Sequence, residues 1–261
     1  MYGKRLYWTS YRRGESEHMK YVLDTHTHTI VSGHAYSTIR EMAKAASEKG
    51  LEVLGITEHA PEMPGSCNWI YFSNLKVVPR EYYGVKMLMG CELNILDFEG
   101  TIDLPERILK QMDIVIASMH TPCMKRGSKE EYTQGYLNVM KNPYVNIIGH
   151  PDDSRFPIDY EVLVQGAKEY GKILELNNHS LDPKASRVGG RENDMEMLKY
   201  CTKYQVPIVV GSDAHVDVLV GNHAHAYHLL EECKFPEELV LNTDVAKFYK
   251  YLKEASFYGK F

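Results

Sequence analysis

Two short segments of the 261-residue chain place pairs of metal-ligating side chains two residues apart. His26 and His28 form one pair, and Asp213 and His215 form the other. Side chains at positions i and i+2 of an extended strand lie on the same side of it. Imidazole and carboxylate groups are ligands of zinc, iron and manganese. Each pair therefore predicts two side chains directed at one metal site.

Five further residues of the same types follow other apolar segments. They are His34, His59, Glu92, His120 and His150. A single histidine after a strand is more often a helix cap or a core hydrogen-bond partner than a ligand, so their shared position carries the argument. A catalytic metal takes about three or four protein ligands, so nine candidates suit two or three ions. Glu92 would then have to bridge two of them.

The elements that must position these residues alternate between apolar strands and amphipathic helices. We expect strands over 21–25, 51–57, 85–93, 113–118, 145–149, 172–176 and 207–211. We expect helices over 38–49, 128–140, 160–170, 192–204, 224–233 and in the last segment of the chain. Short apolar strands separated by helices are typical of parallel strands buried on both faces. About seven such units predict an α/β fold with a closed or nearly closed barrel.

In a parallel barrel the carboxyl ends of all strands open on one face, where barrel enzymes keep their active sites. The nine candidate ligands would surround that face. Three other histidines, His223, His225 and His228, lie at the start of a late helix, where we expect a solvated face.

Composition excludes several classes of protein. The net charge is -5 and no basic run is present, which argues against a nucleic-acid-binding protein. The five cysteines lack CxxC spacing, which favours free thiols in a reducing compartment, and we expect a cytoplasmic protein. No apolar run reaches the roughly 18 residues of a membrane helix. The N-terminus has no apolar region typical of a secretory signal.

Residues 1–20 differ from the rest because aromatic and basic side chains alternate there. We interpret this segment as an N-terminal arm, and residues 21–261 as a single barrel domain, because no Gly/Ser/Pro-rich linker divides them. The arm could contact its own barrel or a neighbouring copy, so the oligomeric state stays open.

The motifs around these residues resemble those of the polymerase and histidinol phosphatase (PHP) superfamily, and most of all its small stand-alone bacterial phosphatases of the YcdX type. The matching segments are Asp24-Thr25-His26-Thr27-His28-Thr29, His34-Ala35-Tyr36-Ser37-Thr38, Thr57-Glu58-His59, Gly90-Cys91-Glu92-Leu93-Asn94, Ser118-Met119-His120, Gly149-His150-Pro151 and Gly211-Ser212-Asp213-Ala214-His215. The resemblance runs from about Met19 to the C-terminus. It implies a distorted seven-stranded (β/α)7 barrel of the TIM type.

The resemblance also implies three metal ions and a ligand set for each. The first set is His26, His28, Glu92 and Asp213, the second is Glu92, His120 and His150, and the third is His34, His59 and His215. Zinc is the expected metal, with manganese or iron as alternatives. Where many relatives carry aspartate before the second-strand histidine this chain has Glu58, which we expect to orient His59. Asp24 is either a similar orienting group or a hydrogen-bond acceptor at a strand end.

Three divalent ions would keep the site positive and attract an anion such as a phosphate monoester. Metal binding lowers the pKa of water from about 15.7 to near 7, which would supply a bound hydroxide. Glu92 and Asp213 are the candidate catalytic residues. Arg187, Arg155, Asn178 and His179 are the candidate substrate-binding residues, since arginine suits phosphate oxygens. The predicted function is therefore a phosphatase acting on a small phosphorylated substrate.

Several alternatives stay open at this point. A histidinol-phosphate phosphatase of the same superfamily could share every ligand. A PHP-type phosphodiesterase or nuclease would require a basic groove, which the sequence does not indicate. A barrel that binds metal without turnover is disfavoured by the intact ligand set. Hydrolysis of a C–N bond in related barrels relies on a bridging carboxylated lysine, and no lysine here ends a strand.

Overall fold

The computed structural model describes residues 20–257, and the side chains of residues 20–253. The arm predicted over residues 1–20 lies outside the described residues except for Lys20. The strands of the described part are β1 Leu23–Asp24, β2 Val53–His59, β3 Glu81–Tyr82, β4 Val85–Asn94, β5 Ile114–Ser118, β6 Ile147–Ile148, β7 Ile173–Asn177 and β8 Ile208–Gly211.

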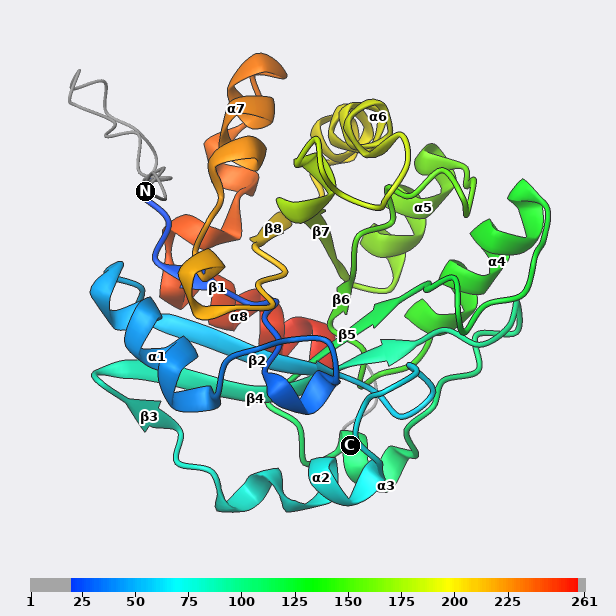
Figure 1. Ribbon diagram of the computed structural model, residues 1–261. Coiled ribbons are helices and arrows are strands. Elements are labelled where there is room, and N and C mark those ends of the chain that lie inside the picture. The colour runs from blue at the N-terminus through cyan, green and yellow to red at the C-terminus, as the bar shows by residue number, and fades with distance from the viewer. Residues whose placement is uncertain (1–19, 258–261) are drawn as a thin grey trace, which may run out of the picture.

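Seven of these strands form one parallel sheet in the order β1-β2-β4-β5-β6-β7-β8. A parallel bridge between Thr27 and Ala214 links the ends of the first and last strands, so the barrel is nearly closed (Figure 1). The short β3 pairs antiparallel with β4 outside this series. The predicted α/β fold, a distorted seven-stranded barrel of the TIM type, is confirmed.

Helices follow most of the strands, and they cover the outside of the barrel except for α8, which lies across one end. They are α1 Ile39–Glu48, α2 Trp69–Asn74, α3 Glu106–Leu109, α4 Lys129–Met140, α5 Tyr160–Glu169, α6 Gly190–Tyr204, α7 Ala224–Glu232 and α8 Val245–Phe257. None of the helices in the described residues is long and apolar enough to cross a membrane.

Capping chemistry explains where two of the helices begin. Thr38 before α1 and Ser128 before α4 each accept a hydrogen bond from the third helical N–H, and Glu41 and Glu131 return the contact. This reciprocal arrangement satisfies N–H groups that have no partner inside a helix. Gly50 follows α1 with a φ of 74°, a conformation that glycine adopts without steric cost.

The apolar core has two layers. The larger one lies between the strands and the surrounding helices. The smaller one joins alternate residues of the strands, including Leu88, Ile116 and Val209, to Phe248 and Leu252 of α8. Because alternate residues of a strand face the same side, this second cluster fills the barrel interior. In Figure 1 α8, drawn in red, lies behind the strands, where it covers the end opposite the candidate site.

The structure adds elements that the apolar pattern did not predict. β3, α2 and α3 lie in connections for which no strand or helix was predicted. The first and fifth predicted strands are each reduced to a two-residue ladder, β1 and β6. A strand is defined by its hydrogen bonds to a neighbouring strand. In β1 and β6 these hydrogen bonds cover fewer residues than the apolar segments that predicted the strands.

Candidate metal centre

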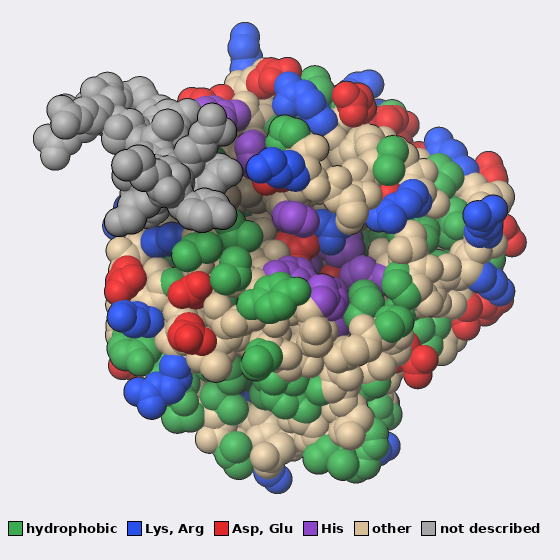
Figure 2. Space-filling model, viewed as in Figure 1, with side chains coloured by type: hydrophobic (Ala, Val, Ile, Leu, Met, Phe, Trp, Pro, Cys, Tyr) green, Lys and Arg blue, Asp and Glu red, His purple; other side chains and the backbone are tan. Residues whose placement is uncertain are grey.

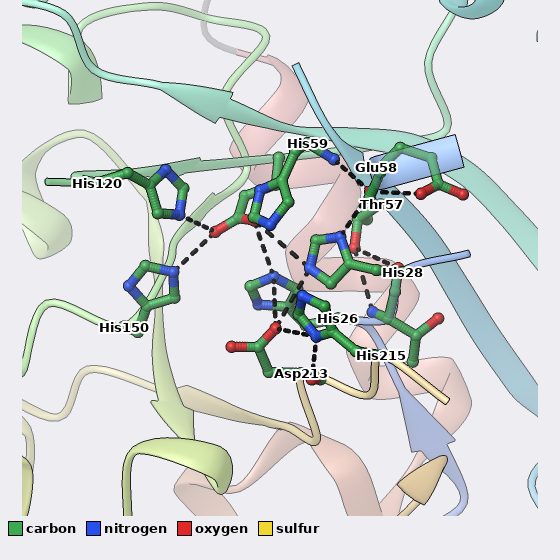
Figure 3. A network of polar contacts seen from close by, with 12 residues as sticks. His26, His28, Thr57, Glu58, His59, His120, His150, Asp213 and His215 are labelled. Carbon is green, nitrogen blue, oxygen red and sulfur yellow. Dashed lines mark hydrogen bonds and ion pairs between the residues drawn. The ribbon is translucent and has the colours of Figure 1, made fainter. Parts of the chain in front are cut away.

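Histidines and carboxylates from the carboxyl ends of the strands converge on one side of the barrel, in a hollow where the imidazoles are visible (Figure 2). Figure 3 shows His26, His28, His59, His120, His150, Asp213 and His215 directed toward a common centre. The structure thus brings together the candidate ligands that the sequence analysis named, and His34, which was also among them, lies beside His59 and His215. The ring of His34 lies 4.9 Å from the rings of both His59 and His215.

Glu92 is the hub of this cluster, and it is completely buried. Its Oε2 lies 2.8 Å from Nδ1 of His59, 3.3 Å from Nε2 of His26 and 3.5 Å from Nε2 of His28. Its Oε1 lies 2.8 Å from Nε2 of His150 and 3.2 Å from Nε2 of His120. Each carboxylate oxygen therefore faces its own group of imidazoles. This arrangement suits a carboxylate that is shared between two ions, with one ion at each oxygen.

The far nitrogens of several imidazoles are held by hydrogen bonds outside the cluster. Nδ1 of His26 donates to Glu175 at 2.7 Å, and Nδ1 of His120 donates to the amide oxygen of Asn94 at 2.8 Å. Nδ1 of His215 contacts the carbonyl of Asp213 at 2.9 Å. Metal-ligating histidines characteristically donate their other ring N–H to such groups, which fixes the ring orientation.

A hydrogen-bond chain also fixes the loop after β1. Ser32 lies 3.2 Å from Nδ1 of His28 and donates at 2.6 Å to Glu58. Glu58 accepts two further bonds from the backbone and hydroxyl of Thr29. The expectation that Glu58 orients the ring of His59 is therefore corrected: its carboxylate holds the loop that carries His28, because that loop lies beside the end of β2.

Glu175 is a functional residue that the sequence analysis did not single out. It is completely buried on β7, where its Oε2 accepts the backbone N–H of His150 at 2.8 Å while Oε1 holds His26. A charged residue in the middle of the buried strand Ile173–Asn177, between Leu174 and Leu176, is the signal that could have identified it. A carboxylate at such a position needs a polar partner inside the barrel.

Two candidate ligands have left-handed backbone conformations. The φ of His150 is 26° and that of Asp213 is 53°. Non-glycine residues seldom adopt positive φ, and such strain persists only where surrounding contacts impose it. Asp213 is held by Arg187, whose Nη2 donates to its Oδ2 at 2.9 Å. Its Oδ1 lies 3.3 Å from Nε2 of His28. One oxygen of Asp213 therefore faces the histidine cluster, and the other faces Arg187 at the wall of the cavity.

The charges of the cluster follow from burial and from mutual contact. Burial would raise the pKa of Glu92, but His26, His120 and His59 outweigh it and hold that pKa well below its usual range. Burial lowers the pKa of His28 and brings that of His120 to about 4, so both rings are neutral at pH 7. Ionised carboxylates and neutral imidazoles are the states that bind a metal.

His26 is the exception to this pattern. Burial lowers the pKa of His26, but Glu175, Glu92 and Asp213 outweigh burial and raise it well above its usual value. The proton on His26 balances the surrounding carboxylates. A metal ion at this position would displace that proton.

Unsatisfied atoms show that the donor set fits a metal centre. Among the described residues, the buried atoms with no hydrogen-bond partner include Nε2 of His26, His28 and His120, Nδ1 of His59 and Oε2 of Glu92. Buried polar atoms without partners are rare in proteins, and an ion is one of the explanations for them. Three triads have ligand atoms within 4.8 Å of one another: His28–His59–His215, His26–His28–Glu92 and His59–Glu92–His120.

These triads share residues with one another. They also differ from the three ligand sets that the resemblance to the PHP superfamily implies. In the geometry His28 groups with His59 and His215, whereas the resemblance groups His59 and His215 with His34. Both divisions make Glu92 common to more than one group.

A cavity of about 410 Å³ opens above the centre. Arg187, Arg155 and His179 line it, together with Asp213 and His215. Asn178, the fourth predicted substrate-binding residue, does not reach it. The side chain of Asn178 is buried and accepts the backbone N–H of Ala226 in α7 at 3.1 Å, because the polypeptide turns away from the mouth at that point.

Two other expectations are settled by contacts at the edge of the centre. Asp24 is a backbone acceptor, since it accepts the N–H groups of Ser212 at 3.1 Å and Gly221 at 2.8 Å. The expectation that His223 lies on a solvated face is wrong. His223 is buried, with Nε2 3.7 Å from Oδ1 of Asp24, because the start of α7 packs against β1.

Comparison with known proteins places these observations in a family. The sequence matches the PHP domain over residues 24–186. A protein named as a probable phosphatase from Clostridium novyi is 52% identical over 235 residues, which cover 90% of this chain and 96% of the relative. A probable phosphatase from Acetivibrio thermocellus is 50% identical over 235 residues, with the same coverage of both chains.

A solved structure is similar in fold. It is histidinol phosphate phosphatase from Lactococcus lactis, crystallised with zinc, L-histidinol and phosphate. The TM-score is 0.51 at 19% sequence identity, and the match covers 82% of this chain and 94% of the other.

Proposed function

The chain belongs to the PHP domain family, and from this membership we propose that it is a metal-dependent phosphatase that hydrolyses phosphate monoesters. The observation that carries the proposal is the position of Glu92, a fully buried carboxylate with each oxygen facing a different group of imidazoles. The names of the relatives point in the same direction.

We propose that three divalent ions occupy the cluster. The first would be held by His26, His28, Glu92 and Asp213, the second by Glu92, His120 and His150, and the third by His34, His59 and His215. The zinc in the Lactococcus lactis enzyme supports zinc as the metal, and manganese or iron would suit the same ligands. When bound, such ions polarise phosphoryl oxygens and lower the pKa of a bound water to about 7.

Asp213 is the residue that we propose orients the attacking water, by accepting a hydrogen bond from it at Oδ1. Burial would raise the pKa of Asp213, but His26 and Arg187 outweigh it and hold that pKa well below its usual range. Oδ2 is fixed by Arg187, which leaves Oδ1 directed into the cluster. A fixed carboxylate next to the reacting atoms avoids reorganisation during the reaction.

Arg187 and His179 are the residues that we propose bind the phosphate. Nη1 of Arg187 donates to Asn177 at 3.2 Å and to Ser180 at 3.1 Å, so the guanidinium is held in place before substrate arrives. A planar guanidinium suits phosphate oxygens, and a preorganised one loses less entropy on binding.

Hydrolysis of p-nitrophenyl phosphate tests the proposal. The protein would be loaded with zinc, manganese or iron and compared with Glu92→Gln, with the metal content of both measured by mass spectrometry. Metal-dependent release of nitrophenol that is lost in Glu92→Gln is the expected result. Glu48→Gln, at an exposed position on α1, is the matched control and should retain full activity. A wild-type protein that holds metal and hydrolyses no monoester would overturn the proposal.

A further inference from the structure

Asp103 lies outside the histidine cluster, in the connection between β4 and α3, but Asn94 links it to the candidate ligand His120. A turn brings Asp103 back to the end of β4, where Ile95 and Ile102 form an antiparallel bridge. The backbone N–H of Asn94 donates to Oδ1 of Asp103 at 3.0 Å. Its side-chain Nδ2 donates to Oδ2 of Asp103 at 2.6 Å. Asp103 therefore holds both the backbone and the side chain of Asn94.

The side-chain amide of Asn94 has only one favourable orientation. Its NH2 group donates to Asp103 and also to the carbonyl of Ala60 at 3.2 Å. Oδ2 of Asp103 accepts a further bond from the backbone N–H of Glu62 at 3.0 Å. If the amide were turned over, its oxygen would face a carboxylate and a carbonyl, which accept hydrogen bonds and do not donate them. The oxygen of Asn94 must therefore face His120, whose Nδ1 lies 2.8 Å from it.

This contact determines which nitrogen of His120 carries hydrogen. His120 is one of the neutral rings of the cluster, and a neutral imidazole has one N–H and one acceptor nitrogen. Because the oxygen of Asn94 can only accept, the hydrogen of His120 lies on Nδ1. Nε2 of His120 is then an acceptor, and it lies 3.2 Å from Oε1 of Glu92.

Two acceptors that face each other in a buried site are unfavourable unless a cation lies between them. Nε2 of His120 is one of the buried atoms of the described residues that have no hydrogen-bond partner. With the hydrogen on Nε2 instead, His120 would donate to Glu92, and both groups would be satisfied without a metal. The orientation of Asn94 prevents this alternative.

We propose that Asp103 is a positioning residue of the metal centre, which acts through Asn94 to keep Nε2 of His120 available to an ion and to prevent a hydrogen bond from His120 to Glu92. The inference rests on the ion that the proposed function assigns to Glu92, His120 and His150. Asp103 is not among the residues that line the cavity, so it acts only through its contact with Asn94.

The position of the hydrogen on His120 is the first readout. Nitrogen-15 NMR of the full chain after metal removal measures it, and the signal of His120 is identified by its loss in His120→Gln. The wild type should carry the hydrogen on Nδ1. Asp103→Asn provides an amide that can donate to a turned-over Asn94, so the hydrogen of His120 should move to Nε2. A role of Asp103 in folding alone would not move it.

Zinc affinity is the second readout, and titration against a chromophoric chelator measures it. Loss of a group that orients a ligand typically lowers metal affinity by about 10- to 100-fold, and we expect Asp103→Asn to weaken the ion at His120 in that range. Adding Asn94→Asp to Asp103→Asn places an acceptor beside His120 and a donor at position 103. The double variant should therefore return the hydrogen to Nδ1 and recover most of the zinc affinity. Both variants affect the bond from Glu62 in the same way, so this effect cancels between them.

Two more variants separate this role from general damage. Asp97→Asn is the matched control in the same turn, because Oδ1 of Asp97 accepts the backbone N–H of Thr101 at 2.9 Å and an amide oxygen can do the same. Neither readout should change in this control. If Asp103→Asn does not fold, Asn94→Leu should give the same two changes, since leucine is similar in shape and accepts no hydrogen bond.

The outcomes keep the two proposals apart. The inference is overturned by a wild-type His120 with its hydrogen on Nε2, by equal zinc affinity in Asp103→Asn and the wild type, or by a double variant that recovers neither readout. Both readouts as expected, in a zinc-loaded protein that hydrolyses no p-nitrophenyl phosphate, would overturn the phosphatase and leave the role of Asp103 standing. A wild type that binds no zinc, manganese or iron would overturn both.

Discussion

Oε1 of Glu175 lies 2.7 Å from Nδ1 of His26, with both side chains completely buried inside the barrel. The same carboxylate accepts the backbone N–H of His150 through Oε2. One residue on β7 therefore fixes a ring that follows β1 and a backbone that follows β6. The positions of two candidate ligands depend on a side chain that contacts neither the cavity nor the solvent.

Replacing Glu175 by glutamine should loosen His26 without removing a candidate ligand. The amide retains one acceptor but loses the charge that stabilises the donating imidazole. Loss of a group that orients a ligand typically lowers metal affinity or activity by about 10- to 100-fold. We expect Glu175→Gln to lower both zinc affinity and kcat/KM in that range. Glu196→Gln, at an exposed position of α6, is the control, and equal metal affinity in the two variants would contradict the role.

Gly211 gives Glu175 the space that it occupies. A Cβ at this position would lie 2.0 Å from Oε1 of Glu175 and 2.9 Å from the Cβ of His26. Gly211→Ala should therefore displace the carboxylate and lower the free energy of unfolding by about 1–3 kcal/mol, as overpacking usually does. Urea unfolding and zinc titration measure the two effects. A Cβ added at Gly135 in α4 would come no closer to a neighbour than 3.1 Å, and the atom at that distance is the flexible end of Met119, so an equal loss in the Gly135→Ala control would argue against a local clash.

Much of the barrel could be predicted because its strands are apolar throughout and its helices carry clear end signals. The helix predicted over 38–49 agrees with α1, Ile39–Glu48, which Thr38 caps at its start and Gly50 follows at its end. The short β3 and helices α2 and α3 could not be predicted in this way, because contacts with the rest of the chain stabilise them rather than their own periodicity.

The candidate ligands could be predicted because residue type and position at strand ends are both visible in a sequence. Their supporting contacts could not, since those join segments far apart in the chain. Glu175 and His26 are 149 residues apart in the sequence. Asn178 was predicted to bind substrate, but its side-chain oxygen accepts a hydrogen bond from the backbone of Ala226. The ion pair between Arg155 and Asp153 depends on the side-chain rotamers of both residues, which the sequence does not specify.

Lys172 gives a pH dependence that is separate from the metal centre. It is 2% exposed, donates to the carbonyl of Val145 at 2.7 Å, and has its pKa lowered by burial from 10.5 to about 8. The unfolded chain therefore binds more protons than the folded one between about pH 8 and 10.5, so the contribution of Lys172 to stability rises with pH across that window. At 1.36 kcal/mol per pKa unit the full rise is about 3 kcal/mol.

A comparison with Lys172→Met isolates this contribution, because buried tyrosines and cysteines titrate in both proteins and cancel. Urea unfolding at about pH 7 and about pH 10 should show the wild type gaining roughly 2–3 kcal/mol relative to the variant. A difference between the two proteins that does not change with pH would mean that Lys172 titrates normally.

Removal of metal should destabilise the protein as well as inactivate it. A ligand that binds only the folded state adds about 2.7 kcal/mol when its free concentration is 100 times its dissociation constant. For a chain of this size 1 kcal/mol changes Tm by about 2–4 °C, so a chelator should lower Tm by about 5–10 °C and added zinc should restore it. Glu92→Gln removes the carboxylate on which the imidazoles converge, so its Tm should respond to neither treatment. A wild-type Tm that is the same with chelator and with zinc would mean that the buried imidazole nitrogens and the carboxylate of Glu92 satisfy one another, and that the cluster stabilises the barrel without an ion.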